Sequence, residues 1–203
     1  MVSPRNNLEE AVRVAGTGFL AAENLLLTAW HCVCTKLDDD HVYAVARYSA
    51  LGDGPEEIAV LSSISQKRGG SDIATAKVDF EPIHRLPLTE NIEFPRGTQV
   101  WVLGYPFEDV KRSDHGQMDI TLHPRYLQGY VMHQFDFHWE HGRLDFGTDA
   151  TLELDLPAPK GVSGSPLLRF DSREIIRMVF GEREAYTLLD EESDDGGEIV
   201  RGD

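Results

Sequence analysis

Hydrophobic residues in this chain occur in short runs, and residues typical of turns separate most of them. The clearest case is residues 16–32, where two apolar runs flank Ala22, Glu23 and Asn24. Apolar runs on either side of such a turn are typical of a β-hairpin. The pattern therefore predicts a buried hairpin that ends at His31.

Further short runs rich in β-branched and aromatic residues predict more strands, at residues 41–48, 57–64, 72–78, 98–106, 126–139, 144–146, 151–156, 166–170 and 175–180. No segment has the periodicity of a helix of about ten residues or more. Residues 108–117 are charged and indicate a loop. Short strands with Gly and Pro turns between them predict an all-β barrel or sandwich.

In the long run 126–139, alternate positions should lie on one face of a strand, because side chains alternate across a sheet. The positions concerned are Val131, His133, Phe135, Phe137 and Trp139.

A stretch with prolines at positions 82, 87 and 95 lacks periodicity and predicts a connection between two halves. We expect an N-terminal unit at 1–81, a connection at 82–97 and a C-terminal unit at 98–203. The last unit contains the acidic segment 190–198, which indicates a solvated loop or tail. A calcium-binding loop or a docking tail is the alternative for this segment.

The composition excludes some classes of function. The chain has 203 residues, of which 41% are hydrophobic, so it can build a core. Its formal net charge of −16 repels phosphate backbones, which argues against a nucleic-acid partner. No apolar run is long enough for a membrane-spanning helix, and no secretory signal precedes the first predicted strand.

The only two cysteines, Cys32 and Cys34, are two positions apart, a spacing that rarely allows a disulfide. No further cysteine completes a thiolate metal site. We interpret both as free thiols, which favours a reducing compartment and predicts a cytoplasmic protein.

A candidate for chemistry is the segment in which a serine stands between glycines, Gly161-Val162-Ser163-Gly164-Ser165-Pro166. Glycines permit positive φ and close approach of backbones, so a turn here would present Ser163 at a surface. The amides of Gly161 and Ser163 would then point at one spot, as in an oxyanion hole. On its own, such a cluster is more often a plain turn.

His31, Asp72 and Ser163 together make a stronger case. A serine hydroxyl becomes nucleophilic beside a base, and histidine can act as that base near neutral pH. A buried carboxylate fixes the tautomer of the histidine and stabilises its charged form. All three residues lie where a predicted strand meets a turn, so the sequence predicts a catalytic triad.

These segments resemble the trypsin-like, chymotrypsin-fold serine peptidases, and the resemblance covers residues 16 to 181. Residues 28–32 (TAWHC) resemble the family's T-A-A-H-C segment, and 72–74 (DIA) resemble its D-I-A segment. Residues 104–106 (GYP) match a turn of bacterial members, and 161–166 (GVSGSP) resemble the nucleophile segment. The order His, Asp, Ser is that of chymotrypsin, with 41 residues from His31 to Asp72 and 91 from Asp72 to Ser163.

The resemblance implies two six-stranded antiparallel β-barrels with the active site in the cleft between them. It places His31 and Asp72 in the first barrel and Ser163 in the second. It also implies a serine endopeptidase that acts on proteins or peptides through an acyl-enzyme and needs no cofactor.

The sequence departs from the family pattern at two places. Secreted relatives bridge the cysteine that follows the histidine, but the partner position falls near Gly16, so Cys32 is left free. Val162 stands where members activated by cleavage have an aspartate that pairs with a new N-terminus. Either the nucleophile segment is permanently ordered, or a partner or an associated regulatory subunit orders it. We expect slow turnover of generic peptides by the isolated chain.

Substrate preference follows from the resemblance only in outline. Pro157 falls near the position where trypsin-type pockets hold an aspartate, so strong selectivity for Arg or Lys is not expected. The opposite wall is expected near Val179, Phe180 and Gly181. Lys160 would favour an acidic side chain, although a surface role is the more common one for such a lysine.

Three alternatives remain at this stage. The first is a protein-binding module that kept the fold and lost its chemistry. The second is a regulated protease within a larger bacterial assembly. The third, for the segment 133–141 alone, is a zinc site, but His133 and His138 are an odd number of positions apart and point to opposite faces of a strand. No metal site is therefore predicted.

Overall fold

The computed structural model describes residues 1–11, 13–48, 55–67, 71–80, 87–90, 93–106, 110–112, 118–120, 124–141 and 144–180. Within these ranges the chain forms antiparallel sheets and one helical turn, α1 (Trp30–Val33). The predicted all-β class is confirmed.

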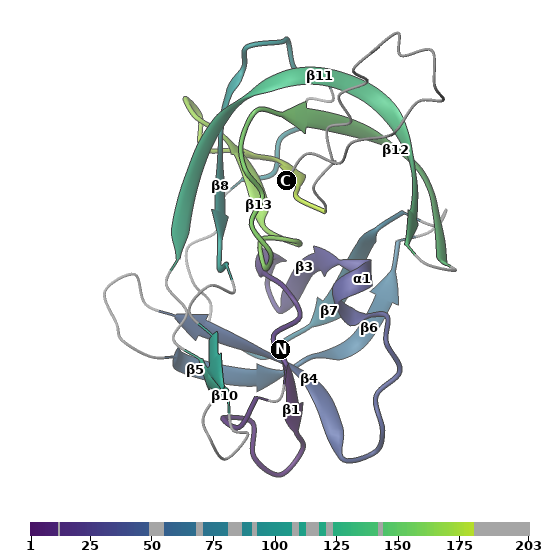
Figure 1. Cartoon of the computed structure of the whole chain (residues 1–203), viewed down its shortest axis with the longest axis vertical. Coiled ribbons are helices and arrows are strands. Elements are labelled where there is room, and N and C mark those ends of the chain that lie inside the picture. The colour runs from purple at the N-terminus through teal and green to yellow at the C-terminus, as the bar shows by residue number, and fades with distance from the viewer. Residues whose placement is uncertain are drawn as a thin grey trace, which may run out of the picture.

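The N-terminal part forms two sheets, drawn in purple and blue in the lower half of Figure 1. One has the order β2-β3-β7-β6, formed by β2 (Gly18–Ala22), β3 (Leu25–Ala29), β7 (Ile73–Lys77) and β6 (Ser62–Gln66). The other has the order β1-β4-β5, formed by β1 (Val2–Pro4), β4 (His41–Tyr48) and β5 (Pro55–Val60).

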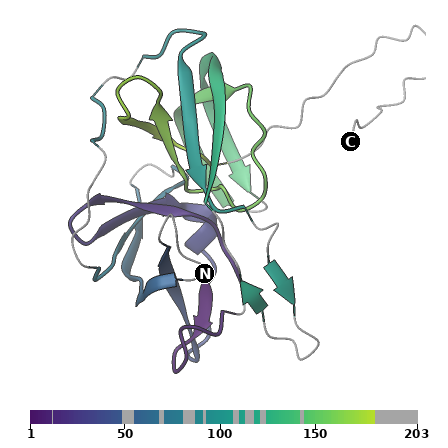
Figure 2. The same cartoon turned by 90° about the vertical axis from the view of Figure 1, so that its left-hand side faces the viewer.

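The C-terminal part forms one sheet with the strand order β12-β11-β8-β13-β14. Its strands are β8 (Gln99–Gly104), β11 (Arg125–His141), β12 (Leu144–Leu154), β13 (Pro166–Arg169) and β14 (Ile175–Met178). A separate hairpin joins β9 (Val110–Arg112) and β10 (Met118–Ile120). Figures 1 and 2 both show this sheet above the N-terminal sheets, with the start of β13 directed toward β3 and α1.

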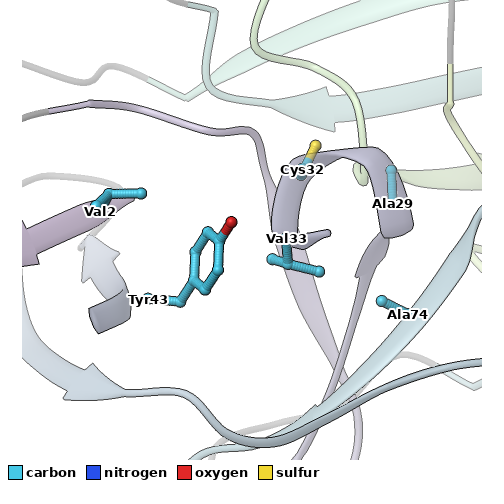
Figure 3. Packing of buried hydrophobic residues seen from close by; sticks show 6 residues of the cluster. All are labelled: Val2, Ala29, Cys32, Val33, Tyr43 and Ala74. Carbon is cyan, nitrogen blue, oxygen red and sulfur yellow. The ribbon is translucent and has the colours of Figure 1, made fainter. Parts of the chain in front are cut away.

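Each part has its own hydrophobic core, because alternate residues of its strands point inward. In β8, for example, Val100 and Val102 are fully buried while Trp101 between them is only half-buried. Two clusters lie in the N-terminal part and one, around Val100, Val102 and Val131, lies in the C-terminal part. Figure 3 shows the N-terminal cluster that supports α1, with Val33 directed toward Tyr43 and Ala74 below the helical turn.

The predicted hairpin is confirmed as β2 and β3, with Asn24 in the turn at a φ of 57°. It does not continue as a strand to His31, because β3 ends at Ala29 and the helical turn begins at Trp30. The prediction was wrong for these positions. Their backbone amides bond to Asp72 rather than to a neighbouring strand.

Other strand boundaries also differ from expectation. Residues 57–64 are divided between β5 and β6, with Ser63 at a φ of 49°. The two segments expected at 144–146 and 151–156 form one strand, β12, because it pairs with the long β11. The hairpin β9–β10 lies partly in the charged segment expected to be a loop.

The expected common face of β11 is interrupted. Val131 is fully buried, whereas His133 is exposed. A register shift in the pairing with β12 lies between these two residues, and such an irregularity turns the following side chains to the other face.

The expected connection between the halves contacts the C-terminal sheet. Leu88 forms an isolated parallel bridge with Ile175, and the amide of Thr89 donates to the carbonyl of Ile175 over 3.0 Å. The proposed unit boundaries at 81 and 98 stay a prediction. In the described part of the chain, no helix has the length and apolar character needed to cross a membrane.

Candidate active site

His31 lies in the helical turn α1, beside Asp72, which immediately precedes β7. The imidazole Nδ1 is 2.7 Å from Asp72 Oδ2, and the His31 amide donates to Asp72 Oδ1 over 2.9 Å. The amide of Trp30 donates to the carbonyl of Asp72 over 3.2 Å. Asp72 therefore serves as both the partner of the imidazole and the acceptor for the first amides of the turn, which otherwise have no intrahelical partner.

Strand pairing explains why residues 41 positions apart meet. β3 and β7 are antiparallel, with Ala29 opposite Ile73. The residue after Ala29 therefore lies beside the residue before Ile73. The Asp72 side chain is 5% exposed and that of His31 is 19% exposed, so the pair is largely shielded from solvent.

This environment changes the pKa of His31. Burial alone lowers it, but the interactions with the side chains of Asp72 and Cys32 outweigh burial and raise the pKa from 6.5 to about 10. The carboxylate thus favours the charged imidazolium, as a general base needs when it accepts a proton.

The nucleophile loop, which we define as residues 161–164, precedes Ser165 and β13. Its two glycines adopt positive φ, 103° at Gly161 and 86° at Gly164, a conformation that favours glycine. The amide of Val162 donates to the carbonyl of Pro159 over 3.3 Å and closes a turn around Gly161. The expected sharp turn, with glycines where positive φ is needed, is present.

The amides of Gly161 and Ser163 donate no hydrogen bond to any described residue. The next two amides of this segment are paired, Gly164 with the carbonyl of Val179 and Ser165 with that of Val162. Buried or half-buried amides without an acceptor are uncommon in folded proteins. Two such donors in one loop are what an oxyanion requires.

The nucleophile loop lies against the N-terminal part next to His31. The carbonyl oxygen of Ser163 accepts the amide of Thr17 over 2.8 Å and is 4.0 Å from Sγ of Cys32, the residue after His31. Figure 3 shows the sulfur of Cys32 on the side of the turn opposite Val33 and Tyr43. Ser163 itself is half-buried.

The structure thus joins His31 to Asp72 directly and brings the backbone of Ser163 to the same helical turn. No hydrogen bond joins the hydroxyl of Ser163 to the imidazole in the described residues. In ligand-free enzymes such catalytic bonds are often long and tighten only with substrate.

The residues expected to line the substrate pocket differ from one another in exposure and in their contacts. Pro157 and Lys160 are exposed. Val179 is half-buried, packs against the C-terminal core, and exchanges backbone hydrogen bonds of 2.6 and 2.9 Å with Gly164 and Ser165. Phe180 is half-buried, and Gly181 lies outside the described residues. Val179 therefore contacts the nucleophile loop.

Sequence reasoning missed the residues that hold the loop, Thr17 and Thr28, which are both buried. Thr17 stands between two glycines before β2, and Thr28 begins the TAWHC segment, but neither pattern shows a contact across the sheets.

Cys32 and Cys34 are free thiols in the structure, as interpreted from their spacing. No group of three or more His, Cys, Asp or Glu side chains suited to a metal ion occurs in the described part of the chain.

Residues 16–176 match the family model of the trypsin-like peptidase domain. This range includes His31, Asp72 and Ser163 and covers more than half of the chain. A comparison with curated proteins finds no significant match.

Solved structures share the fold. The inactive form of the Rv3671c protease of M. tuberculosis has a TM-score of 0.57 and 18% identity, over 82% of this chain and 72% of that one. The apo MamO protease domain from Magnetospirillum magneticum has a TM-score of 0.56 and 17% identity, over 81% and 75%.

The HtrA-type protease AlgW, solved with a decapeptide, has a TM-score of 0.56 and 18% identity. The match covers 82% of this chain but only 43% of AlgW. At these identities the likeness shows the fold alone. The active form of Rv3671c scores 0.56, nearly the same as the inactive form, so overall likeness does not distinguish the two states.

Proposed function

The chain belongs to the family of trypsin-like peptidase domains, and on that basis we propose that it is a serine endopeptidase with His31, Asp72 and Ser163 as its catalytic triad. The observation that carries the proposal is the buried pairing of His31 with Asp72 beside a loop with two amides that find no acceptor among the described residues. A base, its orienting carboxylate and oxyanion donors are the parts that acyl transfer requires.

In the proposed reaction, Nε2 of His31 accepts the proton of the Ser163 hydroxyl as Oγ attacks the carbonyl carbon of the scissile peptide. The amides of Gly161 and Ser163 donate to the negatively charged oxygen that forms. His31 then gives the proton to the leaving amine, and an acyl-enzyme remains. Water then attacks the ester as His31 accepts its proton. His31 passes this proton to Oγ as the acid leaves, which restores free Ser163.

Asp72 supports these steps without losing its charge. In the neutral form of His31, Oδ2 of Asp72 accepts the Nδ1 proton, which leaves Nε2 without a proton and therefore able to act as a base. Its Oδ1 accepts the amide of His31, which fixes the backbone that carries the imidazole.

Substrate preference, cellular setting and activation are further parts of the proposal. The pocket is proposed near Pro157, Lys160, Val179 and Phe180, without strong selectivity for Arg or Lys. Cleavage-site profiling on a digest of a whole proteome tests this: frequent cleavage after Arg and Lys alone contradicts it. The two free cysteines support a reducing, cytoplasmic setting, which cell fractionation tests. Activation by a partner stays a prediction.

Labelling with a fluorophosphonate tests the proposed activity, because the reagent phosphonylates only a serine activated by a base. The wild-type chain should label, and Ser163→Ala should not. The matched control is Ser165→Ala, since the buried hydroxyl of Ser165 has no hydrogen-bond partner among the described residues. This variant should label like the wild type. Wild-type protein that folds but does not label would instead support the non-catalytic binding module.

A further inference from the structure

Thr17 is a buried residue of the N-terminal part that bonds to two carbonyls of the nucleophile loop. Its exposed fraction is 6%. Its amide donates to the carbonyl of Ser163 over 2.8 Å, and its hydroxyl donates to the carbonyl of Gly161 over 2.8 Å. One side chain and its own backbone therefore fix two carbonyls of a loop that lies 144 positions away in the sequence.

These two carbonyls belong to the same residues as the proposed oxyanion donors. The carbonyl of Gly161 belongs to the peptide bond that follows the Gly161 amide, and the carbonyl of Ser163 to the bond that follows the Ser163 amide. Because peptide units are planar, each carbonyl fixes the plane that it shares with the next amide, that of Val162 or Gly164. Only φ and ψ of Gly161, or of Ser163, then separate a fixed plane from each proposed donor. Gly161 has the widest choice of φ and ψ of any residue type, so its orientation depends most on such a bond.

The hydroxyl of Thr17 is held in turn by its neighbours. It accepts the amide of Tyr105 over 3.2 Å, and the Thr17 carbonyl accepts the hydroxyl of Thr28 over 2.7 Å. Thr28 lies in β3, three positions before His31. A continuous path of hydrogen bonds thus runs from the strand before the base to the loop with the nucleophile.

Steric fit reinforces these bonds. A Cβ at Gly164 would overlap the Thr17 carbonyl oxygen and would lie 2.6 Å from the hydroxyl oxygen of Thr28. A Cβ at Gly16 would lie 2.8 Å from the carbonyl oxygen of Ser163. The loop therefore packs against the backbone of the N-terminal part with no room for a further methyl group.

No charge takes part in this arrangement. Val162, which is 2% exposed, has an apolar side chain between the two bonded carbonyls and cannot form an ion pair. Resting on the proposed peptidase activity, we propose that Thr17 is the positioning residue of the nucleophile loop. Its hydroxyl holds the Gly161 carbonyl and so restrains Gly161, whose amide is one of the proposed oxyanion donors, without an N-terminal ammonium.

Three variants test this role. Thr17→Val keeps the shape of the side chain and removes the hydroxyl, Thr17→Ser keeps the hydroxyl, and Thr98→Val is the matched control. The hydroxyl of Thr98 donates to the carbonyl of Pro95 over 2.7 Å, far in sequence from the loop. The control therefore loses a bond between the same two groups, a threonine hydroxyl and a backbone carbonyl, at an exposed place outside the nucleophile loop.

The first readout is the inactivation rate constant, kinact, for a fluorophosphonate, measured separately from its KI. Thr17→Val should lower kinact by about 10²-fold and leave KI within about twofold, because Thr17 is proposed to act through the oxyanion donors and not on the reagent. Thr17→Ser should restore most of the rate, and Thr98→Val should keep it. Equal losses in Thr17→Val and Thr98→Val would overturn the proposal, since both would then reflect stability.

The second readout does not depend on activity. The ¹³C shift of the Gly161 carbonyl and the amide shifts of Gly161 and Val162 report the loop directly by NMR. They should move in Thr17→Val and stay near wild-type values in Thr17→Ser. Unchanged shifts in Thr17→Val would overturn the positioning role. If the wild type fails to label, the peptidase proposal fails, while these shifts still decide whether Thr17 orients the loop.

Discussion

The His31–Asp72 pair and the nucleophile loop are held by different kinds of contact. The pair lies within one sheet, where adjacent strands bring a carboxylate to an imidazole and to two backbone amides. The loop depends on the other half of the molecule, through uncharged bonds to Thr17 and close packing on Thr28. The proposed base is therefore complete within the N-terminal part, whereas the loop with the proposed nucleophile is held where the two parts pack together.

This difference separates the electrostatic and steric requirements of the site. Changes at Asp72 should alter protonation and leave the fold of the loop intact. Changes at Gly164 or Thr17 should alter the position of the loop and leave the His31–Asp72 pair intact. The predictions below test this separation.

The largest expected effect is that of Gly164→Ala. The residue has a φ of 86°, and the added methyl group would overlap the carbonyl of Thr17. The loop must then leave its position, so fluorophosphonate labelling should fall below detection. Gly97→Ala is the control, because Gly97 has a φ of 81° but no atom within 4 Å of an added Cβ.

The control isolates backbone strain, which costs roughly 1–2 kcal/mol for a non-glycine residue in this conformation. Gly164→Ala should lower the free energy of unfolding by about 1–3 kcal/mol more, as expected for overpacking. Urea unfolding measures the free energy of unfolding of both variants. Equal destabilisation of the two variants would mean that the loop does not pack tightly across the two parts.

The next largest effect is that of Asp72→Asn, with a loss of about 10⁴-fold in the labelling rate. The amide nitrogen of asparagine would donate to Nδ1 of His31, which moves the imidazole proton to Nε2 and removes the base. The Gly161 and Val162 amide shifts should stay at wild-type values, in contrast to Thr17→Val.

The chain offers a matched control for this change. Asp38 and His41 form a similar pair at 2.6 Å, but the Asp38 side chain is 68% exposed, compared with 5% for Asp72. Asp38→Asn should leave labelling unchanged, because exposed pairs of this kind contribute little. A similar loss in both variants would show that the effect is not specific to the site.

The same difference explains what the sequence reveals. The hairpin of β2 and β3, the glycine turn at 161–164 and the candidates His31 and Asp72 could be predicted because their signals are local or chemically distinctive, such as flanking apolar runs and a serine between glycines. The proposed role of Thr17 depends on contacts with Gly161 and Ser163, which are 144 and 163 − 17 = 146 positions away, and no local pattern records them. The turn α1 was missed for a related reason, since its amides bond to Asp72, 41 positions away.

Side-chain alternation also has a limit as a guide. It correctly predicts the buried and half-buried positions of β8, which has no irregularity. It fails in β11, where a register shift separates Val131 from His133. A bulge inserts one residue into a strand without a marked change in composition. The sequence therefore gives no sign that the side chains after the bulge point to the other face of the sheet.

The smallest expected effect is a difference in pH dependence between the two regions. The pKa of His31 is raised from 6.5 to about 10 in the folded chain, so the charged imidazole stabilises the fold. That contribution is fully present below pH 6.5 and is lost as pH rises toward 10. The destabilisation caused by His31→Gln should therefore shrink over this window in urea unfolding.

Labelling by the wild type should rise over the same window, because catalysis needs the neutral base. The destabilisation by Thr17→Val should stay constant, since hydroxyl and carbonyl groups do not titrate there; a parallel decline in both variants would contradict the separation.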